Sequence, residues 1–422
     1  MSGTTTPRHP SAADPTDAVA DPTEAVEAAA AVAVRELGAG AWSYFGDPRA
    51  ISHDGDTFTG WISTTGNVWV ARYSAEGRLT KRVLFKGLGR DDHNNPSLVF
   101  RHDGHIMVFF SPHSGHHLPP PGIPSRMRYM VSLNPYSING FGKVRTVSVN
   151  APGGLGYTYP NPIQLKDKLW LFWRGGGWNP TFSWTEDGYK WAPARELVYF
   201  GQGQRPYAKY VGDGDRRIHA IYTDGHPENW KNSLHYVRYE AGALYAMSGS
   251  KIGTLDDVPI HTSELDHIYN YSDSGGRAWG HDIALTSDGR PRVVYTRRVA
   301  NRDTFWYAYH NGTKWISRRM VEAGVGRPSF HSGGATLDHE DPRVVYLSRT
   351  IGHWNQVEQW FTPDDGRTWT HRQLTNDPNG YAIRPVTPRG QGQSRNRILY
   401  VWGDERTIGF TDYTTRIHAL DF

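Results

Sequence analysis

Short apolar runs alternate with polar turns along most of the chain, and one version of this pattern recurs. In each copy a polar turn precedes a run of apolar, β-branched and aromatic residues, which is typical of a β-strand. Seven copies are present: HDGDTFTGWI, HDGHIMVFFS, LKDKLWLFW, GDGDRRIHAIY, SDGRPRVVYT, HEDPRVVYLS and SRNRILYVWG. Their matching positions are Thr57, Ile106, Leu169, Ile218, Val293, Val344 and Ile398. A strand pattern repeated roughly every fifty residues predicts a β-propeller.

Each copy has the position of the second strand of a blade. Apolar segments precede five of the copies (NPSLVF, NPIQL, YAKYV, HDIALT and GGATLD), and further strand-like segments follow three of them (VWVARYS, SLHYVRY and FWYAYHN). Four strands therefore fit into one repeat. The sequence predicts an all-β fold, a seven-bladed β-propeller of four-stranded antiparallel blades, whose ring protects the strand edges.

The segments outside this repeat have different compositions. Residues 1–38 are rich in Pro, Ala, Thr and Asp, which predicts a disordered leader with a short helix over Glu24–Glu36, followed by a propeller catalytic domain over residues 39–422. Long insertions at His116–Arg128 and Gly249–Arg277 are expected to form functional rims. Thr362–Trp369 and Trp184–Trp191 fit the Asp-box pattern, a structural turn that says little about chemistry.

Composition and charge exclude several classes of function. The chain has 16 Trp and 23 Tyr but no Cys, which excludes disulfides and thiol nucleophiles. The net charge of +4 is scattered, so nucleic acid is not an expected partner, whereas Arg and aromatic side chains suit an acidic polysaccharide. No apolar run is long enough to cross a membrane. No secretory signal is visible either, so we expect a protein that is cytoplasmic or has lost its signal. We also expect a monomer.

The candidate site lies where the innermost strands of the blades begin, because these positions converge around the central channel. Polar residues at the starts of first strands and the ends of second strands are His93, Asn94, His113, Tyr157, Tyr159, Arg174, Arg205, Tyr207, His281, His331 and Arg384. The set is rich in acid and base groups and poor in carboxylates. Tyr157 and Tyr159 are two residues apart, so we expect their side chains to share a strand face. The residues expected to bind substrate are Arg205, Tyr157, Tyr207, Asn94, His281 and Arg384. Ordinary glycoside hydrolysis needs two carboxylates, which are not evident here.

His, Tyr and Arg suit a β-elimination from a uronic acid instead. Arg neutralises the sugar carboxylate, a base removes the C5 proton and an acid protonates the departing O4 oxygen. Structural interpretations stay open for the same residues. His93 and His113 are also compatible with turn histidines, Tyr157 and Tyr159 with packed aromatics, and His281 and His331 with channel plugs or zinc ligands. No cofactor is required, and a structural calcium or zinc ion stays open.

The segments DDHNNPSLVFRHDGHIMVFFSPHSG, TYPNPIQL with LFWRGG, and HSGGATLDHEDPRVVYLSR strongly resemble the BNR-4 propellers. This group includes polysaccharide lyase families 24 and 25, the ulvan lyases, and related rhamnose–glucuronate lyases. The resemblance covers residues 40–422 and implies a lyase. It implies that His93 and His113 are the active-site histidines, that Tyr159 is the catalytic tyrosine, and that Arg174 or Arg205 neutralises the carboxylate. Within this group we favour histidine as the base and tyrosine as the acid.

Two other functions are compatible with the sequence. A sister group with this propeller resembles an α-L-rhamnosidase acting on rhamnose–glucuronate linkages through a lone histidine on the opposite face, for which His53 is the candidate. The second alternative is a non-catalytic glycan-binding propeller, in which Trp and Tyr at the channel rim bind sugar. The titratable residues at the strand starts favour an enzyme over such a binding module.

Overall fold

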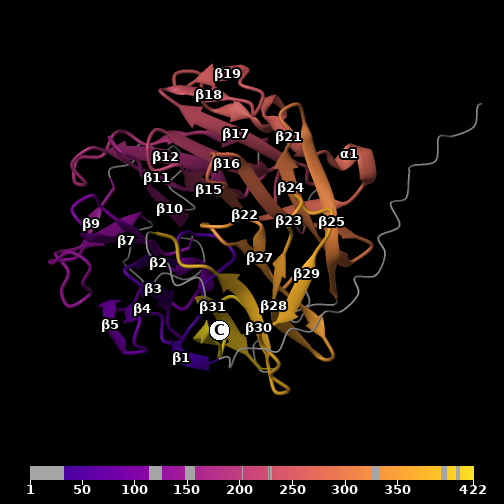
Figure 1. The fold of residues 1–422 in the computed structure, drawn as a ribbon. Helices are drawn as coiled ribbons and strands as arrows, with labels where there is room; N and C mark the ends of the chain where they lie inside the picture. The colour runs from indigo at the N-terminus through magenta and orange to yellow at the C-terminus, as the bar shows by residue number, and fades with distance from the viewer. Residues whose placement is uncertain are drawn as a thin grey trace, which may run out of the picture.

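A computed structural model describes residues 33–113, 126–147, 157–201, 203–226, 228, 231–324, 332–390, 397–404 and 409–422. These residues form seven antiparallel sheets arranged in a ring, which confirms the predicted seven-bladed β-propeller (Figure 1). Each of the seven recurrent segments of the sequence is the second strand of its blade. In the part of the chain that is described, no helix has the length and apolar character needed to cross a bilayer.

The blades follow one another along the chain. Blade 1 comprises β2 (Ala50–His53), β3 (Asp56–Ile62), β4 (Val68–Tyr73) and β5 (Leu79–Phe85). Blade 2 comprises β6 (Ser97–Phe100), β7 (Ile106–Phe110), β8 (Arg128–Val131) and β9 (Arg145–Thr146). Blade 3 comprises β10 (Thr158–Gln164), β11 (Leu169–Arg174), β12 (Pro180–Thr185) and β13 (Arg195–Glu196).

Blade 4 is enlarged by the second insertion. It comprises β15 (Ala208–Gly212), β16 (Arg217–Thr223), β17 (Leu234–Glu240), β18 (Ala243–Tyr245), β19 (Lys251–Thr254) and β21 (Asp266–Tyr269). Beside it, β14 (Val198–Tyr199) pairs in parallel with β20 (Ile260–His261), followed by the short helices η3 (Thr262–Glu264) and α1 (Tyr271–Ser274). The insertion Gly249–Arg277 therefore contributes strands to the outer part of a blade (Figure 1).

The last three blades close the ring. Blade 5 comprises β22 (Arg277–Leu285), β23 (Pro291–Val299), β24 (Arg302–His310) and β25 (Trp315–Gly324). Blade 6 comprises β26 (Ala335–Leu337), β27 (Val344–Ile351), β28 (Trp354–Phe361) and β29 (Thr370–Gln373). Blade 7 comprises β30 (Tyr381–Val386), β31 (Arg397–Gly403), β32 (Arg416–Asp421) and, at its outer edge, β1 (Ala33–Ala39).

Strand β1 corrects the predicted boundary of the leader. Ala33 pairs with Asp421 and Ala39 with Arg416, so residues 33–38, assigned to the leader, already belong to the propeller. The helix expected over Glu24–Glu36 is wrong for its described part, which is extended. The first four residues of β1 are exposed, so the sequence there carries no signal of a buried strand. They pair with the C-terminal strand β32. Residues 1–32 of the expected leader and residues 114–125, which include most of the first insertion, lie outside the described residues.

Apolar clusters fill the interfaces between neighbouring blades. One example lies between blades 2 and 3 and contains Met107, Phe109, Leu171 and Trp173. Strands β7 and β11 are buried along their whole length because a neighbouring blade covers each of their faces, which is why both read as continuous apolar runs. The outer strand β29 is exposed or half-buried and polar. The two Asp boxes form turns, since Asp187 and Asp364 accept backbone hydrogen bonds there.

Buried ion pairs join blade 4 to the segment that precedes blade 1. Lys209 of β15 is 1% exposed and donates to Asp47 Oδ2 at 2.7 Å, while Arg49 donates to Asp47 Oδ1 at 3.0 Å. We expect Asp47→Ala to lower the free energy of unfolding by about 3–5 kcal/mol, because it leaves two buried cations without their carboxylate. Denaturant titration measures this change. Asp215→Ala, at an exposed carboxylate, serves as the control and should cost less than about 0.5 kcal/mol; equal effects of both substitutions would contradict the prediction.

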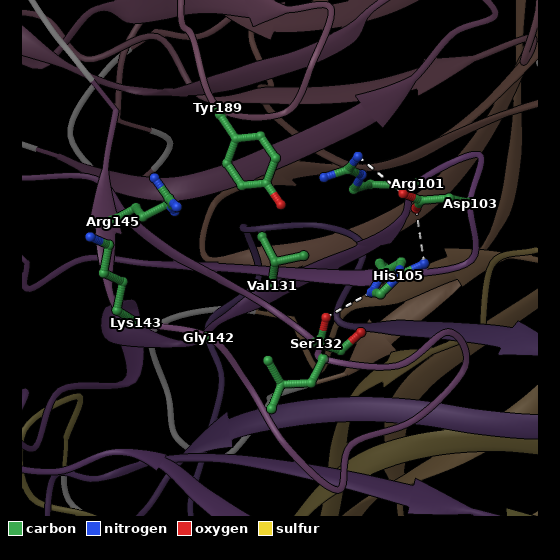
Figure 2. Close-up of a pocket in the computed structure, with 10 residues that line it drawn as sticks. Arg101, Asp103, His105, Val131, Ser132, Gly142, Lys143, Arg145 and Tyr189 are labelled. Atoms are coloured by element: carbon green, nitrogen blue, oxygen red, sulfur yellow. Dashed lines mark hydrogen bonds and ion pairs between the residues drawn. The ribbon is translucent and has the colours of Figure 1, made fainter.

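The strand order places the two ends of each blade on opposite faces of the ring. First strands begin, and second strands end, on one face, whereas the turns between first and second strands lie on the other. On this second face a pocket of about 260 Å³ opens between blades 2 and 3 (Figure 2). The residues singled out in the sequence as strand starts therefore belong to the first face. His53, the last residue of β2, belongs to the second face.

Candidate active site

The centre of the candidate site is a turn that precedes blade 2. Asp91 caps the short helix η1 (Asp92–Asn94) by accepting the backbone N–H of His93 at 2.9 Å. His113 follows the end of β7 and reaches the same turn, where its backbone N–H donates to Asn94 Oδ1 at 2.5 Å. Asn94 in turn donates to the carbonyl of Gly89, and Thr158 of blade 3 donates to the carbonyl of His93. Asn94 is buried and joins the backbone of His113 to this turn.

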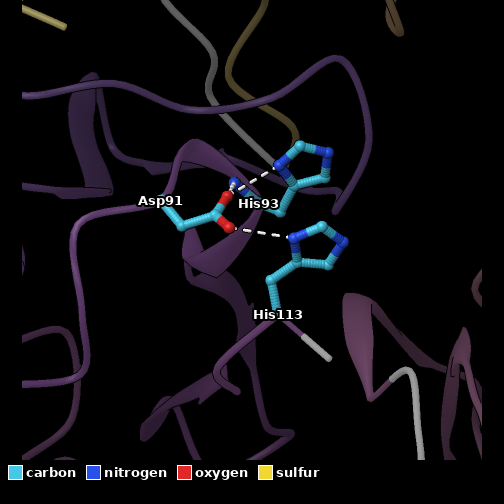
Figure 3. Close-up of side chains that lie close together, drawn as sticks. All are labelled: Asp91, His93 and His113. Atoms are coloured by element: carbon cyan, nitrogen blue, oxygen red, sulfur yellow. Dashed lines mark hydrogen bonds and ion pairs between the residues drawn. The ribbon is translucent and has the colours of Figure 1, made fainter. Parts of the chain in front are cut away.

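The two histidines share one carboxylate. His93 Nδ1 lies 2.7 Å from Asp91 Oδ1, and His113 Nδ1 lies 2.9 Å from Asp91 Oδ2. The imidazole rings stack with centroids 4.1 Å apart and planes 2° apart. Figure 3 shows both Nδ1 atoms turned toward Asp91 and both Nε2 atoms turned away from it. Because a carboxylate only accepts hydrogen bonds, both Nδ1 atoms carry a proton, and proton exchange is left to the Nε2 atoms.

The surroundings give the two histidines different charges. Burial lowers the pKa of His93, but the carboxylates of Asp91 and Asp92 outweigh burial and raise it to about 10. Burial and the positive charge of His93 lower the pKa of His113 to about 4, although the hydrogen bond that His113 donates to Asp91 acts in the opposite direction. At neutral pH the pair therefore consists of an imidazolium at His93 and a neutral imidazole at His113. His113 Nε2 then carries a lone pair that can accept a proton.

Arg384 completes the charge balance of this turn from blade 7. Its Nη1 donates to Asp92 Oδ2 at 2.6 Å, and its guanidinium lies 4.5 Å from the centre of the Tyr44 ring. Arg384 was predicted to bind substrate, and the structure places it against Asp92. The carboxylates of Asp91 and Asp92 are almost completely buried and both engaged, so neither is placed to act as a free acid in hydrolysis.

Tyr159 lies next to His93 in an unusual backbone conformation. Its φ is +59°, and the pairing of β10 with β11 shifts register between Thr158 and Asn161, so the strand bulges at this residue. The Tyr159 and His93 rings are 5.5 Å apart. Burial and the neighbouring Tyr207 raise the pKa of Tyr159 well above its usual value, despite the positive charge of Arg174. The phenol therefore keeps its proton at neutral pH and can donate it.

Arg174 lies behind this tyrosine. Its guanidinium is 4.5 Å from the centre of the Tyr159 ring and 4.8 Å from that of Trp178 in η2 (Gly176–Trp178), and its Nη1 donates to the Tyr207 hydroxyl at 2.9 Å. The residue is 5% exposed and forms no ion pair among the described residues, where its Nε and Nη2 also meet no acceptor. A cavity of about 20 Å³ beside it has room for roughly one water molecule.

Arg205 is the more accessible arginine of the site. It is half-buried, and its guanidinium lies 4.4 Å from the centre of the Trp178 ring, so both arginines contact the same indole. Phe410 covers the histidines from the other side, with its ring 5.1 Å from His93 and half exposed. The site therefore presents one cation at its surface and holds a second one buried behind Tyr159.

Asp91, His93 and His113 are also the residues that could hold a metal ion. In their present arrangement each carboxylate oxygen is at hydrogen-bonding distance from an Nδ1 atom. Two atoms bound to a tetrahedral zinc ion at about 2.0–2.2 Å lie roughly 3.4 Å apart, whereas the two Nδ1–oxygen distances are 2.7 and 2.9 Å, which are hydrogen-bonding distances. The cluster therefore has the geometry of a carboxylate that orients two imidazoles.

Three candidate residues lie apart from this cluster. Tyr157 packs into the core between blades 2 and 3, so the expectation that it shares a strand face with Tyr159 is wrong, because the bulge breaks the alternation. His281 is buried in blade 5 with Nε2 near the hydroxyls of Thr296 and Ser332. His53 stacks on Tyr136 with ring centres 3.6 Å apart. His331 lies outside the described residues.

Sequence reasoning missed four residues of the site. Asp91 and Asp92 stand inside the DDHNNP segment, directly before a histidine, but acidic residues are so common in turns that their role was not recognised. No motif or spacing in the sequence marked Trp178 or Phe410 as residues of the site. The expectation of a site poor in carboxylates needs correction, since two carboxylates determine the charge of the histidines.

Comparison with known proteins places the fold in a family. The model of the BNR repeat-containing family matches residues 56–323. The chain belongs to this family. A search of curated proteins finds no significant match. Among solved structures, the chain is similar to a polysaccharide lyase of family PL25, an ulvan lyase. The TM-score is 0.68 at 12% identity, and the match covers 90% of this chain and 94% of that chain.

Another similar structure is that of the polysaccharide lyase Uly1. Its TM-score is 0.58 at 14% identity, and the match covers 89% of this chain and 90% of that one. The PL25 ulvan lyase is also known bound to -[GlcA(1-4)Rha3S]-, and that structure matches with a TM-score of 0.67 at 12% identity over 90% of this chain and 94% of that one. At this identity the likeness establishes a shared fold, so the chain is a BNR-repeat propeller that shares its fold with these lyases.

Proposed function

We propose that this BNR-repeat protein is a polysaccharide lyase that cleaves glycans containing uronic acid and rhamnose by β-elimination. The observation that carries the proposal is the pairing of a neutral imidazole at His113 with a protonated phenol at Tyr159 around the imidazolium of His93. A base and an acid in these protonation states are what β-elimination requires at neutral pH. The PL25 relative supports the choice of substrate, since it is known bound to a glucuronate–rhamnose glycan.

Each residue has a defined part in the reaction. Arg205 binds the uronate carboxylate, which makes the C5 proton more acidic, and His113 Nε2 removes this proton. The electron pair of the C5–H bond forms the C4–C5 double bond as the C4–O4 bond breaks, and the Tyr159 hydroxyl gives its proton to the departing O4. His93 and Arg174 stabilise the negative charge that develops on the sugar and on the phenol, respectively. Solvent then carries the proton from His113 back to Tyr159.

The reaction product tests the proposal. The purified protein is incubated with ulvan, gum arabic and a glucuronan, and the ultraviolet absorbance of a conjugated unsaturated uronate is followed. A rise that persists in His53→Ala, a histidine on the opposite face, supports the lyase. Release of free rhamnose without a rise in absorbance would instead assign a hydrolase, and binding without any product would assign a glycan-binding propeller.

The protonation states predict an unusual dependence of activity on pH. Because the pKa of His113 is lowered to about 4 and that of Tyr159 is raised, we expect kcat/KM to be level between roughly pH 5 and 9 and to fall only as His113 becomes protonated near pH 4. Bound anionic substrate stabilises the protonated form, so the acid limb of kcat should lie at higher pH than that of kcat/KM. An acid limb of kcat/KM near pH 6.5 would contradict this assignment of the base.

A further inference from the structure

The pocket on the face opposite to the histidines combines positive charge with an exposed aromatic ring. It lies between blades 2 and 3 and has a volume of about 260 Å³. Its lining includes Arg101 and His105 from the turn after β6, Lys143 and Arg145 near β9, and Tyr189 from the Asp-box turn of blade 3. Figure 2 shows Arg145 and Lys143 on one side of the hollow, Arg101 and Asp103 on the other, and Tyr189 between them.

The charges of this pocket are not balanced. Asp103 is the carboxylate of the lining, and it is paired with Arg101 at 3.0 Å. Lys143 and Arg145 form no ion pair among the described residues, and both are exposed. His105 donates through Nδ1 to the carbonyl of Ser132, which orients its ring. Two cations therefore face the pocket without a counter-ion, and an anionic group of a ligand can supply it.

The aromatic ring of Tyr189 is partly exposed to solvent. Tyr189 is 44% exposed, and the guanidiniums of Arg101 and Arg145 lie 5.3 Å and 4.7 Å from its centre. Gly188 leaves room for the Arg101 guanidinium beside the turn, because a Cβ at residue 188 would come within 2.9 Å of Arg101 Nη1. Leu133 at the rim is 61% exposed. A simple inorganic anion would leave this apolar surface unused, whereas a sugar ring would cover it.

From these features we infer that the pocket is a second binding site for an acidic sugar residue, whose carboxylate or sulfate ester pairs with Arg145 and Lys143 while its ring packs on Tyr189. The site is separate from the catalytic face, so it tethers the polymer and raises its local concentration at the histidines. The tethering effect rests on the proposed function, whereas the binding of an acidic sugar to this pocket does not.

Calorimetric titration of the full-length His113→Ala protein tests the inference without turnover. The probes are a glucuronan hexasaccharide, its carboxyl-reduced neutral counterpart, and a sulfated neutral hexasaccharide. Arg145→Gln and Tyr189→Ala should each weaken binding at the second site about tenfold, the value for losing one charge-assisted contact. Lys190→Gln removes a neighbouring positive charge that does not line the pocket, and should change the affinity less than about twofold. Binding of the glucuronan or of the sulfated probe identifies the anionic group.

Stoichiometry separates this inference from the proposed function. If both are right, the protein binds two glucuronan probes per chain, and Arg145→Gln weakens one of the two binding events about tenfold while leaving the other unchanged. If the histidine face is not a glycan site, the protein binds one probe, and Arg145→Gln binds it about tenfold more weakly, which still supports the pocket. Binding that is unchanged in both Arg145→Gln and Tyr189→Ala, or equal affinity for the neutral probe, would overturn the inference. Arg145→Gln should also raise KM for polymer while leaving kcat on a short substrate unchanged.

Discussion

Replacing His113 with alanine is expected to lower kcat by about 10²- to 10⁴-fold, because the substitution removes the base that takes the C5 proton. His113 is the one member of the stacked pair that is neutral near pH 7, since burial and the adjacent imidazolium of His93 keep its pKa low. Steady-state measurement of unsaturated product gives kcat. Free imidazole in the buffer should restore part of the lost rate in His113→Ala, which a purely structural role would not produce.

Two further variants distinguish the base from the residues around it. His93→Ala removes the imidazolium, so it should lower kcat and also raise the pKa of His113, moving the acid limb of kcat/KM toward neutral pH. His105→Ala, on the opposite face, is the control and should keep wild-type kcat on a short substrate. Near-native turnover in His113→Ala would show that another group removes the proton.

Arg174→Met is expected to lower kcat by about 10²-fold while leaving the protein as stable as the wild type or about 1 kcal/mol more stable. The arginine is buried and has no carboxylate partner in the described residues, so folding already bears the cost of an uncompensated charge. In the reaction the same charge stabilises the phenolate that Tyr159 becomes when it protonates O4. Activity and stability should therefore change in opposite directions.

Arg49→Met is the matched control for this prediction. Arg49 is also buried, but it donates to Asp47 and to the carbonyl of Ser43. Its loss should lower the free energy of unfolding by several kcal/mol, about 3–5, because Asp47 loses a partner. Thermal and denaturant unfolding measure the stabilities of the two variants. If Arg174→Met is destabilised as strongly as Arg49→Met, Arg174 is a structural residue and its assigned part in the reaction is wrong.

The fold could be predicted from the sequence because its signal is local. Each second strand is buried on both faces, so β7 and β11 appear in the sequence as unbroken apolar runs, and the repeat length gives the ring. The convergence of strand starts also predicted that His93, His113, Tyr159 and Arg174 meet, although they come from different strands. These four residues do lie together, while their individual roles stay predictions.

The details that failed depend on tertiary contacts. Strand alternation predicted that Tyr157 and Tyr159 lie on the same face. A bulge at Tyr159, whose φ is +59°, instead places the two side chains in different hydrophobic clusters. The opposite charges of His93 and His113 follow from distances to Asp91 and Asp92, which no spacing in the sequence reveals. Arg384 looked free to bind substrate, and its partner Asp92 lies far away along the chain.

The pairing of β1 with β32 determines when the molecule can finish folding. Blades 1 to 6 are each built from a continuous stretch of chain, so they can form during synthesis in the order in which they leave the ribosome. Strand β1 emerges early but has no partner until Arg416–Asp421 has been made, and its edge stays unpaired until then. Joining two segments this distant in sequence is slow, because the long loop between them has to close first. The closure of blade 7 is thus the expected last step of folding, and the interval before it is when the nascent protein is most exposed to misassociation through that edge.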